Sequence, residues 1–217
     1  MALLERHFTT SLFDAAGFPV VHHGYCDVSW RNAHGLCSDC SLHLQSADPC
    51  DAVRPDLGGG AVRVLSVANT NPVYVVSSTF GGAAGLGNKC SNGGALSSIG
   101  VSYSVINSVF THNEAIGNGA NPAQAGKPGG GSGGAIYNNG NFFSLQIGGS
   151  VFNNNTANEG GGAVFFVSND RSGRLGLDTS SFARNLSRGF ETSGFPGFFI
   201  IAAPGQPVNT GSTFSVN

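Results

Sequence analysis

Four side chains near the N-terminus have the types and spacing of a zinc site. Cys37 and Cys40 are separated by two residues, and His34 and His43 flank the pair. Thiolates and imidazoles at such spacing are the usual ligands of structural Zn²⁺, with Cys50 as an alternative fourth ligand. No second C-x-x-C follows at a matching distance. Disulfides among the four cysteines before residue 51, or reduced thiols, therefore stay open as alternatives, and Cys90 stands apart from the cluster.

Two glutamates have the best positions for carbohydrate chemistry. Polysaccharide lyases and hydrolases use two or three carboxylates, or carboxylates that hold Ca²⁺ beside a basic side chain. Glu114 in "HNEA" and Glu159 in "ANEGGGA" each follow an asparagine, so stacked repeats would bring them near each other. Asp170 and Arg171 in "SNDRSG" form a second acid–base pair. The alternative interpretation for all four is that they are solvated turn charges.

The element that must position these residues is a repeat. Gly-Gly-Ala followed by an aliphatic residue begins at Gly59, Gly93, Gly133 and Gly161, at intervals of roughly 30 to 40 residues. Between these motifs runs Ser-x-Phe, which ends at Phe110, Phe152, Phe182 and Phe214. Each of these continues as Phe-x-x-Asn, to Asn113, Asn155, Asn185 and Asn217. Phe80 begins an earlier copy that lacks the asparagine.

Short strands and many turns follow from a composition with 34 glycines and only 10% charged residues. A single repeat cannot bury its apolar face, whereas stacked coils bury it and pair the backbone. We therefore predict an all-β, right-handed parallel β-helix of about four coils, with two or three short strands per unit. A propeller blade would need four strands and a longer unit. The phenylalanines would form an interior ladder, and the asparagines would stack at a corner.

The chain divides near Leu57. Residues 58–217 carry the repeat, while residues 1–57 are predicted to be an irregular segment that caps it, with one short helix on Leu4, Phe8 and Leu12. Residues 116–134 are expected to form a flexible insertion at a corner. Because the sequence stops on a fresh Phe-x-x-Asn, we expect truncation at the C-terminus, with an open edge suited to edge-to-edge self-association.

The alternation of Gly-Gly-Ala-[Ile/Leu/Val] with Phe-x-x-Asn over residues 58–217 resembles the repeat of the chlamydial polymorphic membrane proteins. It is similar, more widely, to pectin-lyase-like β-helix proteins of bacteria. This resemblance implies a secreted or surface-exposed module used for adhesion or antigenic display. Glycans or a cell-surface partner would be its ligands, and the location would be extracellular or at the cell surface.

Composition excludes other classes of function. A net charge of −2 gives no electrostatic footprint for nucleic acid, and no apolar run is long enough to span a bilayer. The N-terminus has no signal-peptide pattern, because Glu5 and Arg6 interrupt it. Apart from Zn²⁺ or Ca²⁺ at the sites above, no cofactor is expected. The sequence favours a structural or adhesive module; the alternatives are a carbohydrate-active enzyme and a fragment without independent activity.

Overall fold

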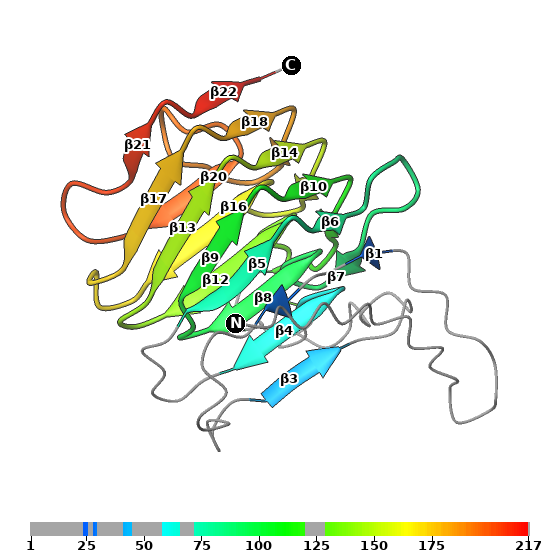
Figure 1. The fold of residues 1–217 in the computed structure, drawn as a ribbon, viewed down its shortest axis with the longest axis horizontal. Coiled ribbons are helices and arrows are strands. Elements are labelled where there is room, and N and C mark those ends of the chain that lie inside the picture. Colours follow the sequence, from blue (N-terminus) through cyan, green and yellow to red (C-terminus); the bar gives the residue numbers. More distant parts are fainter. Residues whose placement is uncertain are drawn as a thin grey trace, which may run out of the picture.

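A parallel β-helix of roughly five coils forms the body of the protein (Figure 1). The structure, a computed structural model, describes residues 58–65, 72–119 and 129–216, and the backbone of three short strands nearer the N-terminus. The predicted fold class is thus confirmed. The number of coils exceeds the expected four because the irregular first repeat completes a coil and the last repeat adds strands to three of the sheets.

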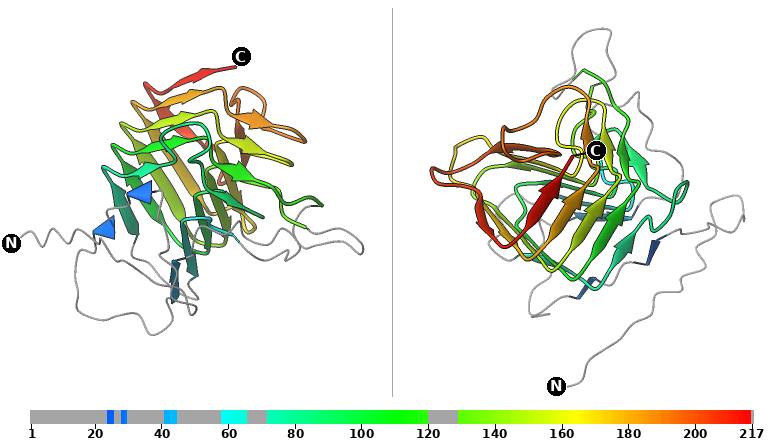
Figure 2. Two further views of the ribbon diagram at one scale, coloured as in Figure 1. Left: turned by 90° about the vertical axis from the view of Figure 1, so that its right-hand side faces the viewer. Right: turned by 90° about the horizontal axis from the view of Figure 1, so that it is seen from above.

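Four sheets form the sides of the solenoid, and each complete coil passes through all four in the same order (Figures 1 and 2). Sheet I contains β4 (Val62–Leu65), β8 (Leu96–Ile99), β12 (Ile136–Gly140), β16 (Val164–Ser168) and β20 (Phe198–Ile201). Sheet II contains β5 (Val73–Val76), β9 (Tyr103–Ile106), β13 (Ser144–Gly148), β17 (Arg174–Asp178) and β21 (Val208–Thr210). Sheet III contains β6 (Thr79–Phe80), β10 (Val109–Thr111), β14 (Val151–Asn153), β18 (Ser181–Ala183) and β22 (Thr213–Ser215). Sheet IV contains β7 (Lys89–Cys90), β11 (Glu114–Ala115), β15 (Thr156–Ala157) and β19 (Leu186–Ser187).

Four strands per complete coil are more than the two or three that the sequence indicated. The run "GRLGLDTSSF" has the length and pattern of one strand, but it contains β17 and the start of β18. Between them Thr179 has a φ of 43°, a left-handed conformation that turns the chain from sheet II to sheet III. In the other coils the same left-handed position is held by Ser77, Asn107, Gly149 or Gly211, so no one residue type marks this corner in the sequence.

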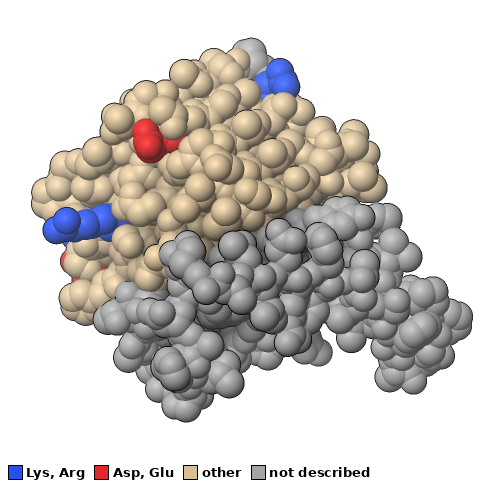
Figure 3. All heavy atoms as spheres, viewed as in Figure 1, with Lys and Arg blue, Asp and Glu red and all other residues tan. Residues whose placement is uncertain are grey.

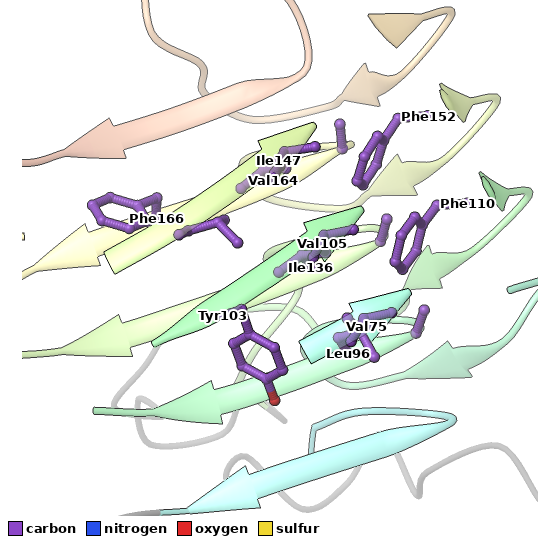
Figure 4. Packing of buried hydrophobic residues seen from close by; sticks show 14 of the residues in the cluster. Val75, Leu96, Tyr103, Val105, Phe110, Ile136, Ile147, Phe152, Val164 and Phe166 are labelled. Atoms are coloured by element: carbon purple, nitrogen blue, oxygen red, sulfur yellow. The ribbon is translucent and has the colours of Figure 1, made fainter. Parts of the chain in front are cut away.

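The core is filled by every second side chain of the strands, which points into the solenoid. In β17 the residues Leu175 and Leu177 are buried, whereas the residues between and beside them face outward. The parallel register places aliphatic side chains of successive coils next to one another: Leu177 lies beside Ile147, and Ile147 beside Val105. Figure 4 shows Val75, Val105 and Ile147 of this sheet lying one above the other from coil to coil. Each coil thus buries the apolar face of its neighbours.

The predicted phenylalanine ladder runs the whole length of sheet III. Its rings stack with centroid separations between 4.6 and 5.1 Å, in the order Phe80, Phe110, Phe152, Phe182 and Phe214. Phe80 joins the ladder although its repeat lacks the Phe-x-x-Asn motif. Apart from the partly covered Phe214, these rings are buried, so the ladder stabilises the coils mainly by removing aromatic surface from water.

An asparagine ladder lies at the next corner, as predicted. The Nδ2 atoms of Asn113 and Asn155 donate to the Oδ1 atoms of Asn155 and Asn185, at 2.9 and 2.8 Å. The first coil supplies Asn88, whose Nδ2 donates to Asn113 Oδ1 at 2.8 Å. The sequence hid Asn88 because a short glycine-rich insertion separates it from Phe80. Asn217 lies outside the described residues.

A third ladder explains the serine of the Ser-x-Phe motif. The backbone nitrogen of each serine donates to the hydroxyl oxygen of the serine in the next coil, at 3.0 to 3.1 Å; the series is Ser78, Ser108, Ser150, Ser180 and Ser212. Each of the first four hydroxyls donates in turn to the carbonyl two residues earlier. These buried hydroxyls replace the backbone pairing that the corner interrupts.

The Gly-Gly-Ala motif forms the corner before sheet I. Gly133 has a φ of 72°, and a Cβ atom there would collide with the Ile136 carbonyl and lie 2.8 Å from Tyr137 N. The corner therefore requires glycine for its conformation and for its space. In the fifth coil Gly197, with a φ of 80°, stands in register with Ala163, the alanine of the motif, and its carbonyl accepts from Ala163 N at 2.8 Å.

Three strands from the N-terminal segment pair with the first coil. The strands β1 (Gly24–Tyr25), β2 (Val28–Ser29) and β3 (Ser41–Leu44) run antiparallel to β6, β5 and β4. They occupy the outer edge of the first coil on three sheets, where unpaired backbone invites aggregation. The sequence shows no periodicity that would indicate these strands, and β1 and β2 have only two residues each. The helix predicted on Leu4, Phe8 and Leu12 lies outside the described residues.

Candidate functional site

Glu114 and Glu159, the predicted carbohydrate-site acids, occupy different rows of the solenoid. In register, Glu114 lies beside Thr156, and Glu159 follows three residues later along the chain. Glu114 Oε2 forms an ion pair with Lys89 Nζ at 3.1 Å, on a surface where both side chains are well exposed. The two glutamates therefore do not face each other from directly stacked positions.

Glu159 holds the neck of the insertion at residues 116–134. Its Oε1 accepts a hydrogen bond from Gly119 N at 3.0 Å, and its backbone nitrogen donates to Gly131 O at 2.8 Å. Beside it, Asn118 N donates to Gly129 O at 2.9 Å and closes the two arms of the loop. A carboxylate that binds backbone in this way positions the loop entry.

Asp170 and Arg171 lie in the exposed turn that joins β16 to β17. Asp170 Oδ1 accepts hydrogen bonds from the hydroxyls of Ser168 and Ser172, at 2.7 and 2.8 Å. These bonds, that from Ser168 first, hold the pKa of Asp170 below its usual value. Arg171 has a φ of 57° and serves the turn through its backbone. The contacts of this pair match the turn interpretation that the sequence left open.

The zinc candidates Cys37, Cys40 and His34 lie outside the described residues. His43 lies in β3, of which only the backbone is described. Within residues 58–65, 72–119 and 129–216, no three His, Cys, Asp or Glu side chains come together as a metal site. The zinc and calcium sites thus stay predictions. In the same part of the chain no helix has the length and apolar character needed to cross a membrane.

Cys90, which stands apart from the other cysteines in the sequence, is disulfide-bonded. Its side chain is buried in sheet IV, in register with Ala115 and Ala157. The other cysteines of the chain all belong to the first 50 residues and lie outside the described residues.

A hollow of about 270 Å³, with polar and apolar lining, lies on the outer face of sheet II, in the last three coils. Its floor is the outward-facing row of β17, in which Gly176 stands between Arg174 and Asp178. Side chains of the neighbouring coils complete it; they are Gln146, Gln206, Val208 and Thr210. Charged side chains are otherwise few and set apart on the face that Figure 3 shows.

Sequence analysis missed this hollow, although a signal was present. In "RLGLD" the alternation of β17 buries both leucines and exposes an arginine, a glycine and an aspartate in one row. The missing element was Gln206, which comes from the next coil and whose turn has no counterpart in the repeat motif.

Comparisons with known proteins identify no relative from which a function could be inferred. No family model, no curated protein and no solved structure matches the chain. What the structure defines is therefore the class of protein: a parallel β-helix with phenylalanine, asparagine and serine ladders.

Proposed function

We propose that this chain is a rigid, non-enzymatic β-helical module that acts at a cell surface or outside the cell and binds a partner through its side faces. The main support for the proposal is that each candidate carboxylate is already bound by another group of the chain. Glu159 binds the Gly119 backbone, Glu114 binds Lys89, and Asp170 binds the serines of its own turn. Hydrolysis or elimination of a glycan needs carboxylates that converge on one sugar.

The location is supported by the disulfide at Cys90. Disulfides form and persist in secreted and surface proteins and are rare in the reducing cytosol. The resemblance of the repeat to chlamydial polymorphic membrane proteins favours the same location, and with it a role in adhesion. Glycans and cell-surface proteins are the partners that such a module would meet.

The test is a binding assay and a turnover assay on the same folded, monodisperse protein. We expect binding to cells or to immobilised glycans, and no release of reducing ends or unsaturated products from acidic or neutral polysaccharides, with or without Ca²⁺. Turnover that Glu159→Gln abolishes would overturn the proposal and make the chain a carbohydrate-active enzyme. Glutamine keeps the acceptor for Gly119 N, so this variant tests chemistry without opening the loop neck.

A further inference from the structure

The hollow over Gly176 combines an arginine and an aspartate that no intramolecular contact engages. Among the described residues, neither the Arg174 guanidinium nor the Asp178 carboxylate has a hydrogen bond or an ion pair. The two lie four positions apart on the same face of β17, roughly 13 Å along the strand. At that distance they do not neutralise each other, so both charges are available to a ligand.

The wall of the hollow is held in place from the fifth coil. Gln206 Oε1 accepts a hydrogen bond from Leu175 N at 2.9 Å, which fixes that side chain across the end of β17. Its Nε2 atom makes no hydrogen bond within the described part of the chain. On the opposite side Gln146 leans into the space that the absent side chain of Gly176 leaves. Two primary amides therefore border the gap, each with donors and acceptors to offer.

The backbone beneath the hollow is already paired. The strand β17 pairs with β13 on one side and with β21 on the other. A peptide strand laid over this face would find no main-chain partner, which is the main source of affinity when proteins bind extended peptides. Recognition here has to come from side chains around a small space, which favours a compact ligand rich in hydroxyl groups.

We propose that this hollow binds one anionic sugar unit of a glycan, such as a uronate or a sulfated residue; this inference rests on the proposed binding function. Arg174 pairs with the carboxylate or sulfate, since a guanidinium binds such oxyanions in a bidentate manner. Asp178 and Thr210 bind hydroxyl groups at the other end. The amides of Gln146 and Gln206 bind those between, and Val208, which is 53% exposed, contacts the apolar edge of the ring.

Titration calorimetry with three tetrasaccharides, one uronate-bearing, one sulfated and one neutral, tests the proposal. The folded wild-type protein is expected to bind at least one anionic tetrasaccharide more tightly than the neutral one. Arg174→Gln should weaken that binding by about tenfold or more, because a bidentate charged hydrogen bond is lost. Arg188→Gln is the matched control: Arg188 is exposed, lies outside the hollow, and its removal should leave the affinity unchanged.

A second variant fills the hollow and keeps both charges. Gly176 has an ordinary strand conformation, so Gly176→Val should fold while it displaces Gln146 and abolishes binding of all three sugars. Ser181→Val, at an exposed position of β18, is its control. Thermal unfolding of each variant checks the fold.

Three outcomes would overturn the assignment. They are anionic binding that survives both Arg174→Gln and Gly176→Val, absence of sugar binding by a protein that still adheres to cells, and an acidic peptide that displaces the bound sugar by binding more tightly. The second outcome leaves the proposed function intact. Cleavage of the tetrasaccharides would instead contradict the proposed function, whether or not the hollow is the site.

Discussion

At the scale of single residues, the asparagine ladder carries an unusual density of hydrogen bonds. The Asn155 side chain makes four: its Oδ1 accepts from the backbone and side-chain nitrogens of Asn113, and its Nδ2 donates to Asn185 Oδ1 and Phe110 O. Asn155 itself is buried. Water cannot replace partners at such a depth, so the ladder fixes the corner through full satisfaction of its polar groups.

Asn155→Ala should therefore destabilise the protein strongly. The substitution removes all four hydrogen bonds; Asn113 Nδ2 keeps its bond to Phe80 O and Asn185 Oδ1 keeps that from Asn155 N, while the buried Asn113 N loses its acceptor. We expect a loss of roughly 4 kcal/mol in the free energy of unfolding. Denaturant unfolding measures it. The control is Asn154→Gly, which keeps the left-handed backbone (φ 56°) and removes exposed contacts to His112 and Arg184, for a loss of about 1 kcal/mol or less. Equal losses for the two variants would contradict this account of the ladder.

At the scale of the elements, glycine decides where sheet I begins. The first glycine of the motif is left-handed in every complete coil, and the second packs its Cα against the backbone of a neighbouring coil. Gly205, in the turn before β21, is also left-handed, with a φ of 77°, but has open space around it. These two kinds of glycine look alike in the sequence and differ only in what surrounds them.

Gly133→Ala and Gly205→Ala distinguish two reasons for glycine at a turn: its left-handed conformation and the lack of room for a side chain. Both place a Cβ on a left-handed residue, which costs about 1 kcal/mol. Only Gly133→Ala also drives that Cβ into the Ile136 and Tyr137 backbone, so its total loss should reach roughly 3 kcal/mol. Thermal unfolding of the two variants beside wild type gives the comparison. If Gly205→Ala proved the more destabilising, the corner would not be limited by space.

The repeat predicted the elements better than it predicted the site. Phe152 and Asn155 recur at a fixed offset, and parallel stacking converts such recurrence into contact, so the ladders could be read in advance. The hollow depends on Gln146, Arg174 and Gln206, which come from three coils and belong to no motif. Their meeting depends on the lengths of the turns between sheets I and II, which differ from coil to coil.

On the scale of the whole molecule, the two ends of the solenoid differ. The first coil is paired with β1, β2 and β3, and its Cys90 is disulfide-bonded. In the fifth coil Asn209 takes the register position beside Leu177, and its side chain bonds the nitrogen and carbonyl of Ser212, at 3.0 and 3.2 Å. Side-chain hydrogen bonds in the fifth coil, together with strand pairing and a disulfide in the first, limit the fraying of coils that contact only their neighbours.

The disulfide should then govern the stability of the whole solenoid, and Cys90→Ala tests this with little disturbance of packing. Alanine already stands at the two positions in register above it, Ala115 and Ala157. We expect Cys90→Ala to lower the free energy of unfolding by about 2–5 kcal/mol, because the tie no longer restricts the unfolded chain. Thermal unfolding of wild type in a strong reductant should give the same lower Tm, whereas reductant should leave the variant unchanged. A wild-type Tm that does not move, while thiol labelling shows complete reduction, would contradict this role of the disulfide.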